Sequence, residues 1–271
     1  MLSGPFLDRN WIGQNEDYNS ADIIMLGLPF DGTVSYRSGS RFASWGLEDY
    51  SPRFDRHLED VNFHDAGDLE FPLGNTYKSL DLIEKNVEEI YKDGKRVFGI
   101  GGEHLVTLPE IKAVSKFYKD LAIVHFDAHT DLREEYLGEE MSHSAVIRHA
   151  SKIAGPENIK QIGIRSGMKE EWEFMKEHKT LISEYSELDV LKDKKIFVTV
   201  DLDVLDPSVM PGTGTPESDG LMYRELAEWI KYLKDFDIVG ADIVELAPDY
   251  DASGVSTAVA TKVIRELLMV M

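Results

Sequence analysis

Short apolar runs alternate with amphipathic stretches along most of the chain. Runs of four to eight apolar or β-branched residues are typical of buried strands, and apolar residues that recur every three or four positions are typical of helices that cover a core. Residues 75–92 show the clearest helical pattern. The pattern predicts strands over residues 21–28, 95–100, 121–126, 159–164, 196–200 and 237–244, and helices over residues 75–92, 109–118, 144–153, 169–178, 223–233 and 256–270.

This alternation of strands and helices predicts the fold class. It is typical of an α/β protein with a mostly parallel sheet covered by helices on both faces, a three-layer αβα sandwich. No repeat, low-complexity segment or linker divides the sequence, so we expect residues 1–271 to form a single domain. Ser218 or Asp219 is the expected N-cap of the helix over residues 223–233.

Composition narrows the range of partners. The net charge is −21, from 29 basic and 50 acidic residues, which argues against nucleic acid and anionic membranes and favours a cationic small molecule. The sequence has no cysteine, so disulfides and thiolate metal sites are excluded. We find neither a signal peptide nor an apolar run of membrane-spanning length, and we expect a cytoplasmic protein.

Metal-binding side chains follow the apolar run at residues 121–126. Asp127, His129 and Asp131 stand within five residues of one another, where the strand should end. Ligands of open parallel sheets collect at the carboxyl ends of strands. Carboxylate and imidazole ligands without thiolate suit a fairly hard divalent ion such as manganese. The alternative is a polar turn that caps the next helix.

Similar residues follow three other predicted strands. His104 follows one strand, Asp201 and Asp203 a second, and Glu245 a third. Residues far apart in sequence can therefore converge at one sheet edge, and two divalent ions with a shared activated water become possible. Taken singly, His104 could be a helix-cap histidine, and the two aspartates could belong to a loop before Pro207 or to a calcium-like surface site.

Five sequence blocks resemble the ureohydrolase family, which comprises the arginases and agmatinases. They are GGEH at 101–104, FDAHTDL at 126–132, SHS at 142–144, DLDVLDPSVMPGTGTPESDG at 201–220 and ELAPDYD from position 245. The resemblance extends from about residue 21 to the end of the chain. The family fold is a three-layer αβα sandwich with a mostly parallel sheet, which agrees with the pattern above.

The resemblance implies two manganese ions and their ligands. One ion would be held by His104, Asp127, Asp131 and Asp201, and the other by Asp127, His129, Asp201 and Asp203. A water activated by the two ions would attack the guanidinium carbon of the substrate, giving urea and an amine.

The resemblance also implies further site residues. His143 matches a mobile-loop histidine that shuttles a proton to the leaving amine, a task that suits imidazole. Glu245 matches the carboxylate that pairs with the guanidinium, and Thr215 would line the same pocket. Glu103 and Asp206 would orient the ligands or the loop that carries them. Gly101 and Gly102 would let the backbone turn tightly beside the metals.

The choice of substrate within the family depends on what binds its far end. The GIR strand continues into Ser166, Gly167 and Met168, where arginases carry an Asp that holds the α-amine. The loop LREEYLGEEMSHS is acidic, with Glu134, Glu135, Glu139 and Glu140, and RSGSRF resembles the agmatinase version. We therefore expect hydrolysis of agmatine to putrescine and urea. Arginine, guanidinobutyrate, formiminoglutamate and N1-aminopropylagmatine remain alternative substrates.

Two departures from the family pattern and two other function classes remain. Glu103 stands where Asp is frequent, and SHS lacks the glycine that often follows the histidine.

The other classes are an amide hydrolase related to histone deacetylases and a non-catalytic binding protein of the same fold. Family resemblance implies a homo-oligomer, a trimer or hexamer. We expect His125 to be packed inside its strand with its polar atoms hydrogen-bonded. We expect the histidines outside any cluster to be structural or surface residues; they are His57, His64, His149 and His178.

Overall fold

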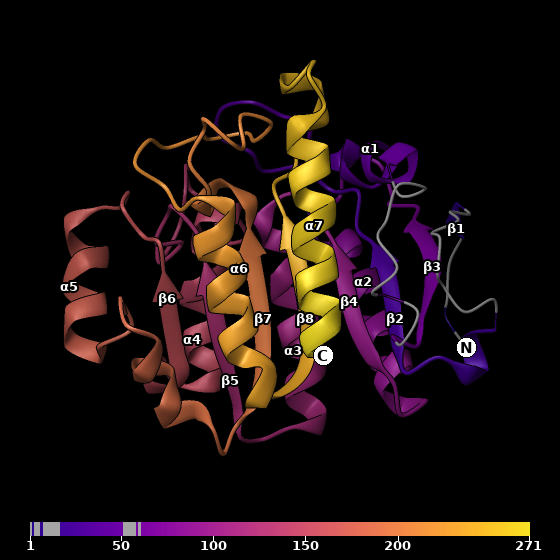
Figure 1. Cartoon of the computed structure of the whole chain (residues 1–271), viewed down its shortest axis with the longest axis horizontal. Helices are drawn as coiled ribbons and strands as arrows, with labels where there is room; N and C mark the ends of the chain where they lie inside the picture. The colour runs from indigo at the N-terminus through magenta and orange to yellow at the C-terminus, as the bar shows by residue number, and fades with distance from the viewer. Residues whose placement is uncertain (1, 3–5, 8–16, 51–57, 59–60) are drawn as a thin grey trace.

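A computed structural model describes residues 2, 6–7, 17–50, 58 and 61–271. Its centre is an eight-stranded sheet in the order β1-β3-β2-β4-β8-β7-β5-β6 (Figure 1). The short edge strand β1 pairs antiparallel with β3, and all other pairings are parallel. The strands are β1 (Phe6–Leu7), β2 (Ile23–Gly27), β3 (Phe63–Leu69), β4 (Arg96–Ile100), β5 (Leu121–Phe126), β6 (Ile159–Ile162), β7 (Lys195–Asp201) and β8 (Asp237–Val244).

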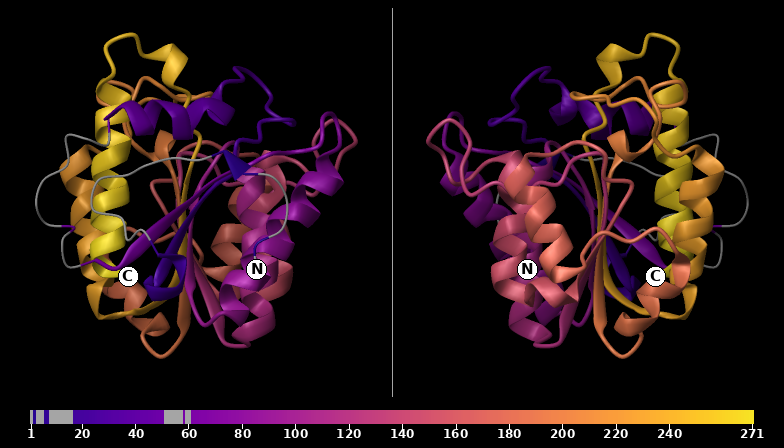
Figure 2. Two further views of the ribbon diagram at one scale, coloured as in Figure 1. Left: turned by 90° about the vertical axis from the view of Figure 1, so that its right-hand side faces the viewer. Right: turned by 90° about the vertical axis from the view of Figure 1, so that its left-hand side faces the viewer.

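Helices cover both faces of this sheet. Figure 2 shows the sheet nearly edge-on, with α6 and α7 on one side and the helices α2 to α5 on the other. The helices are α1 (Ala43–Tyr50), α2 (Thr76–Lys92), α3 (Thr107–Phe117), α4 (Val146–Ala154), α5 (Lys169–His178), α6 (Tyr223–Tyr232) and α7 (Val255–Val270). The expected three-layer αβα fold with a mostly parallel sheet is therefore confirmed.

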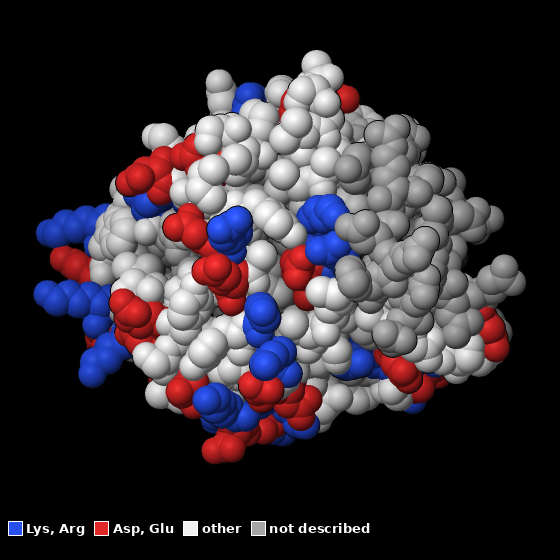
Figure 3. All heavy atoms as spheres, in the orientation of Figure 1, with Lys and Arg blue, Asp and Glu red and all other residues white. Residues whose placement is uncertain are grey.

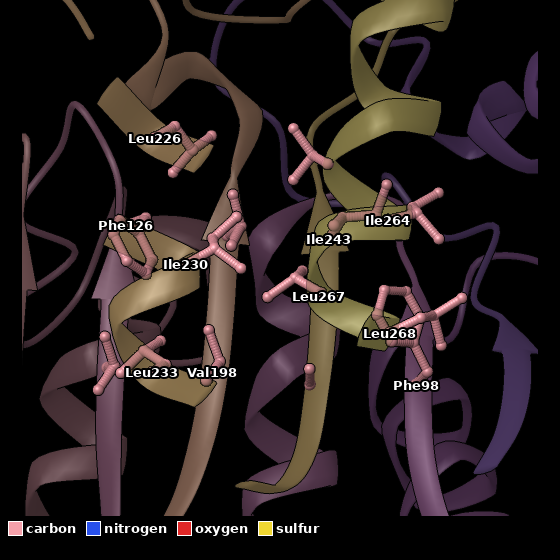
Figure 4. Close-up of a cluster of buried hydrophobic side chains, with 14 of the residues drawn as sticks. Phe98, Phe126, Val198, Leu226, Ile230, Leu233, Ile243, Ile264, Leu267 and Leu268 are labelled. Atoms are coloured by element: carbon pink, nitrogen blue, oxygen red, sulfur yellow. The ribbon is translucent and has the colours of Figure 1, made fainter. Parts of the chain in front are cut away.

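Two apolar cores hold the layers together. One joins α1, α6 and α7 to the sheet, and Figure 4 shows Ile230 of α6 and Leu267 of α7 turned toward sheet residues such as Val198. The other joins α2, α3, α4 and α5 to the opposite face. Because both faces of the central strands are buried, β5 and β7 are mostly apolar and lack a regular alternation of apolar and polar residues, with His125 and Thr199 as buried polar exceptions.

Every strand and helix predicted from the apolar pattern is present, with ends shifted by a few residues. The pattern missed three elements. They are the two-residue strand β1, the strand β3, in which His64, Asp65 and Asp68 interrupt the apolar residues, and the helix α1, which is short and weakly amphipathic. The predicted N-cap of α6 was wrong. The cap is Met222, whose backbone N–H donates to the Glu225 side chain at 2.7 Å. His57 lies outside the described residues.

The outer face formed by α6 and α7 has a mixed charge pattern. Lys and Arg side chains lie among Asp and Glu side chains there (Figure 3). None of the helices within the described ranges is both long enough and apolar enough to cross a membrane.

Candidate metal centre

The carboxyl ends of β4, β5, β7 and β8 bring the candidate residues together. These four strands are neighbours in the sheet, and their loops gather at the top of Figure 1. A cavity of about 270 Å³ opens there, which we call the inner cavity. The predicted site residues that line it are His104, His129, Asp131, His143, Asp201, Thr215 and Glu245. Asp127 and Asp203 are buried, at 0% and 1% exposure, and contact these residues.

A close approach of two loops shapes the base of the inner cavity. A Cβ atom on Gly102 would lie 1.9 Å from the carbonyl oxygen of Phe30, so no other residue fits at this position. Gly101 is similarly confined, because a Cβ would lie 2.6 Å from Cγ1 of Val244. The tight turn expected at these glycines is thus explained by packing of the backbone.

His104 faces three carboxylates. Its Nδ1 atom lies 3.1 Å from Asp127 Oδ2, 3.0 Å from Asp131 Oδ2 and 3.4 Å from Asp201 Oδ2. The opposite ring nitrogen, Nε2, lies 3.1 Å from the Thr199 hydroxyl. The side chain is 1% exposed, so solvent cannot satisfy it.

His129 forms a second group with Asp127 and Asp203. Its Nδ1 atom lies 3.1 Å from Asp203 Oδ2 and 3.4 Å from Asp127 Oδ1. Asp127 therefore contacts both histidines, one through each oxygen. Asp203 stands in a turn after β7 and is not part of the strand, but Asp201 holds it by accepting its backbone N–H at 2.9 Å.

Burial and crowding raise the pKa values of the carboxyl groups of Asp201 and Asp131 and of the His129 imidazole. Burial, then the neighbouring Asp203, raise the pKa of Asp201 well above its usual range. Burial and Asp127 raise the pKa of Asp131 to about 6. Burial opposes a charge on His129, but Asp203 and Asp127 raise its pKa to about 12. Carboxylates that repel one another in the interior are stabilised by cations placed between them.

The environment of His104 Nδ1, which has no hydrogen-bond partner among the described residues, shows whether this cluster suits a metal ion. Nδ1 is buried and makes no hydrogen bond of acceptable geometry, although three carboxylate oxygens lie within 3.4 Å of it. A lone pair directed toward a shared cation explains this arrangement. Four carboxylates and two imidazoles form the donor set that hard and borderline divalent ions prefer. The residues therefore fit divalent ions.

Glu245 closes the inner cavity from β8. It has a left-handed backbone conformation, with φ of +66°, and its Oε1 accepts the backbone N–H of His104 at 3.0 Å. Burial, then the nearby Glu103 carboxyl, raise the pKa of Glu245 well above its usual range. A non-glycine residue held at positive φ is costly and common at functional sites. The cavity thus holds a carboxyl group that a bound cation would stabilise in its ionised form.

The loop at residues 31–35 connects Glu103 to His143. The backbone N–H of Thr33 donates to Glu103 at 2.7 Å, the Thr33 hydroxyl donates to the same carboxylate, and His143 N–H donates to Thr33 Oγ1 at 3.1 Å. Glu103 thereby orients a loop beside the cavity. Burial lowers the pKa of the His143 imidazole to about 4, so the ring is neutral near pH 7.

Asp206 and Arg165 hold the loop that carries Asp203 and Thr215. Asp206 accepts the backbone N–H groups of Ser208, Asp219 and Gly220. All five N–H hydrogens of Arg165 are used, on the carbonyl oxygens of Gly163, Asp203, Val204, Glu217 and Ser218. Asp206 was expected from the sequence, whereas Arg165 was missed because its partners are backbone atoms.

Other contributors were also missed. Thr199 contacts His104 from inside β7, where it reads as an ordinary strand residue. His125, expected to be structural, does bond through both ring nitrogens: Nε2 to Asp127 at 2.8 Å and Nδ1 to Gln161 at 3.2 Å. It therefore orients a central carboxylate of the cluster.

The glutamates of the acidic loop are not among the residues that line the inner cavity, although Arg133 and Tyr136 of the same loop are. Glu134 is exposed and pairs with Arg148 and with Lys152, at 3.2 Å for the latter. The acidic side chain that does line the wall away from the metal cluster is Glu171 at the start of α5, which is 5% exposed. It accepts the Met168 N–H at 2.5 Å, so it reads in the sequence as a helix cap.

Comparison with known proteins agrees with this geometry. The sequence signature described as "Arginase family" matches residues 21–270. The agmatinase of Bacillus subtilis is 48% identical over 275 residues, which cover 96% of this chain and 95% of the relative. A crystal structure of a Clostridium difficile protein, provisionally named an agmatinase, superposes with a TM-score of 0.90 at 46% identity over 94% of this chain and 98% of that one.

Arginases share the fold at greater distance. The crystal structure of a Bacillus subtilis arginase gives a TM-score of 0.78 at 24% identity, covering 91% of this chain and 98% of that chain. The chain belongs to the arginase family of hydrolases that act on guanidino compounds. Three agmatinases that align over 96% of this chain are 44% to 48% identical to it.

Proposed function

We propose that this protein is a dimanganese agmatinase that hydrolyses agmatine to putrescine and urea. The observation that carries the proposal is the convergence of six metal-binding side chains and Glu245 on one small cavity. The similarity to agmatinases over nearly the whole chain supports the choice of substrate.

The proposed ligands divide into two sets that share Asp127 and Asp201. One set is His104, Asp127, Asp131 and Asp201, and the other is Asp127, His129, Asp201 and Asp203. Bound there, divalent ions would lower the pKa of a water and supply a nucleophile at neutral pH. Oxygen-rich donors with two imidazoles favour manganese among the available ions.

Glu245 is the proposed partner of the guanidinium group. A carboxylate can accept two parallel N–H bonds from a planar guanidinium, which fixes the orientation of the carbon to be attacked. The His104 backbone N–H donates to Oε1 of Glu245 and holds the carboxylate in place. Thr215, which donates to Asp203 Oδ2 at 3.2 Å, forms part of the same wall.

His143 is the proposed proton carrier for the leaving amine. Its Nδ1 atom is buried and has no hydrogen-bond partner among the described residues, and its ring lies edge-on to Tyr136 at 5.7 Å. The neutral ring is able to take up a proton before passing it to the amine.

Two side chains on the cavity wall lead to different expectations for the substrate tail. The buried Glu171 carboxylate suits the ammonium group of agmatine. Arg133, which lines the same cavity and packs over the Tyr136 ring, would suit a carboxylate such as that of guanidinobutyrate. Guanidinobutyrate hydrolysis is therefore the second candidate function.

The test is urea release by the manganese-loaded protein from agmatine, arginine, guanidinobutyrate and N1-aminopropylagmatine. We expect the highest kcat/KM for agmatine. A preference for guanidinobutyrate or arginine would refute the agmatine assignment and implicate Arg133. The absence of urea from every substrate, with two metal equivalents bound, would refute ureohydrolase activity.

A matched pair of variants tests the tail assignment. Glu171→Gln keeps the acceptor for the Met168 N–H and removes the charge, so KM for agmatine should rise while KM for an alkylguanidine without an ammonium should not. Glu173→Gln is the control, because Glu173 is exposed and lies outside the inner cavity. Equal effects of Glu171→Gln on both substrates would contradict the assignment.

Assembly and location follow as further parts of the proposal. We infer a homo-oligomer, a trimer or hexamer, of chains that each act as one domain over residues 1–271. A cytoplasmic location is consistent with the absence of cysteine from the sequence.

A further inference from the structure

Two carboxyl groups lie in the interior beneath the proposed metal centre. Glu110 comes from α3 and Asp242 from β8, and both are 0% exposed. They face each other above Gly99 of β4, which pairs with Asp242 in the sheet. A Cβ atom on Gly99 would lie 2.6 Å from Glu110 Oε1 and 2.9 Å from Asp242 Cβ, so the glycine makes room for the carboxyl pair.

Within the part of the chain that the structure describes, this carboxyl pair has no cationic partner in direct contact. Among the ion pairs of the described residues, none includes Glu110 or Asp242, and both oxygens of Glu110 lack a neutral hydrogen-bond donor. Burial, then the neighbouring Asp242, raise the pKa of Glu110 well above its usual range. Two adjacent carboxylates cannot both stay ionised in the interior, so the pair holds one proton.

Two threonines connect the carboxyl pair to His104. Thr107 donates its hydroxyl hydrogen to Asp242 Oδ2 at 2.6 Å. The Thr107 and Thr199 hydroxyl oxygens are 3.4 Å apart, and Thr199 Oγ1 lies 3.1 Å from His104 Nε2. Thr199 is also a hydrogen-bonding neighbour of Asp242.

Counting the hydrogens that can be donated fixes the direction of this series of hydrogen bonds. Each hydroxyl has one hydrogen to donate. Thr107 donates its only hydroxyl hydrogen to Asp242, so Thr107 is the acceptor in its contact with Thr199. The Asp242 carboxylate also only accepts, so the Thr199 hydrogen points toward Thr107 or Asp242. Thr199 can then only accept from the imidazole, which requires a hydrogen on Nε2 of His104. The lone pair is left on Nδ1, the atom that faces the three carboxylates.

We propose that Glu110 is a positioning residue, whose carboxylic acid donates to Asp242, keeps Asp242 an acceptor for the threonines, and so presents Nδ1 of His104 to the metal. The inference rests on the proposed function for the identity of His104 as a ligand. If Asp242 carried the proton on the oxygen facing Thr107, Asp242 could donate to Thr107. Thr107 could then donate to Thr199, and Thr199 to Nε2 of His104, so every hydrogen bond of the series would be reversed.

Infrared spectroscopy tests the carboxyl pair without any metal. An un-ionised carboxylic acid has a carbonyl band above the amide band. Because Asp201 and Glu245 can contribute to the same region, the measurement is the difference spectrum between the wild type and Glu110→Gln near pH 7, in which we expect the band of one un-ionised carboxylic acid. A difference spectrum without that band would overturn the proposal.

Manganese affinity tests the consequence for His104. Glu110→Met removes the donor at similar volume, and Glu110→Gln restores a donor through its amide. We expect roughly 10- to 100-fold weaker binding of one of two manganese ions to the Met variant, the usual effect of losing a group that orients a ligand, and near wild-type binding to the Gln variant. Wild-type affinity in the Met variant, or equal losses in both, would refute the positioning role.

A second pair of variants, at Thr107, tests the same proposal if Glu110→Met does not fold. Thr107→Val removes the hydroxyl at constant shape, whereas Thr107→Ser keeps it. We expect weaker manganese binding to the Val variant with recovery in the Ser variant, and equal affinities would overturn the directed chain. A wild-type protein that binds no manganese contradicts the proposed function instead, and the infrared band then still decides the state of the carboxyl pair.

Discussion

Asp127 stands between two histidines, with Oδ2 at 3.1 Å from His104 Nδ1 and Oδ1 at 3.4 Å from His129 Nδ1. The two histidines come from the ends of different strands, β4 and β5. One carboxylate thus links both halves of the proposed metal centre, and its loss should affect both.

Replacing Asp127 with Ala should reduce bound manganese from two ions per chain to fewer than one. Activity should fall below detection, because Asp127 is the proposed shared ligand of both ions. Metal analysis after dialysis and urea release measure the two effects. Thermal unfolding adds a third: manganese at 100 times its Kd should stabilise the wild type by about 2.7 kcal/mol, and the variant much less.

Asp193→Ala is the control for Asp127→Ala. Asp193 is exposed and lies outside the inner cavity, so its loss removes the same charge without a ligand. Retention of two ions and of activity by Asp127→Ala would refute the bridging assignment.

Glu245→Gln should separate substrate binding from metal binding. The amide cannot provide the charge-assisted bonds to the guanidinium, each worth about 1.5–3 kcal/mol, so kcat/KM for agmatine should fall roughly 10- to 100-fold. Bound manganese should remain at two ions per chain, because Glu245 is not among the proposed ligands. Loss of manganese in this variant would show that Glu245 supports the metals instead.

The sequence predicted the strand-end clusters because a parallel sheet places the carboxyl ends of its strands at one edge. His104, Asp127 and Asp201 are each close to the end of a recognisable apolar run, so their convergence needed no detailed coordinates. The reason given for Asp203 was incomplete. A strand period of two would place it beside Asp201, but it lies in a turn that the Asp201 carboxylate stabilises.

Contacts between distant polar residues could not be predicted in the same way. Thr199, Glu110 and Asp242 have no distinguishing local pattern, since each occupies an ordinary position in a strand or helix. The acidic loop was misleading because composition does not reveal that Glu134 is paired with Arg148. Direction and partners of side chains depend on tertiary packing, which periodicity does not encode.

Asp206→Asn should make stability less dependent on pH in the acid range. Bonds from Ser208, then from the backbone N–H groups of Gly220 and Asp219, lower the pKa of Asp206 from 3.8 to about 2. A depressed folded-state pKa means that the ionised carboxylate stabilises the fold above its unfolded pKa. This contribution is lost as pH falls from about 4 toward about 2.

The measurement for Asp206 is the difference in melting temperature between wild type and variant, both free of metal. The wild type should be the more stable near pH 6, and the difference should shrink toward pH 2. Asp193→Asn is the control and should show no such trend. A difference that stays constant with pH would mean that the carboxylate charge does not hold the loop.

Arg165→Lys should loosen the loop that carries Asp203. Lysine keeps the positive charge, but its three N–H groups on one atom cannot reach the five carbonyl oxygens that the planar guanidinium binds. Carbonyl groups left without a donor cost about 1–3 kcal/mol each when buried, so the melting temperature should fall. Affinity for one manganese ion should fall as well, because Arg165 donates to the Asp203 carbonyl oxygen at 2.7 Å.

Arg224→Lys is the control for replacing an arginine with a lysine, because Arg224 lies on the exposed face of α6. If Arg165→Lys lowered the melting temperature but left both manganese affinities unchanged, the arginine would stabilise the fold without positioning Asp203.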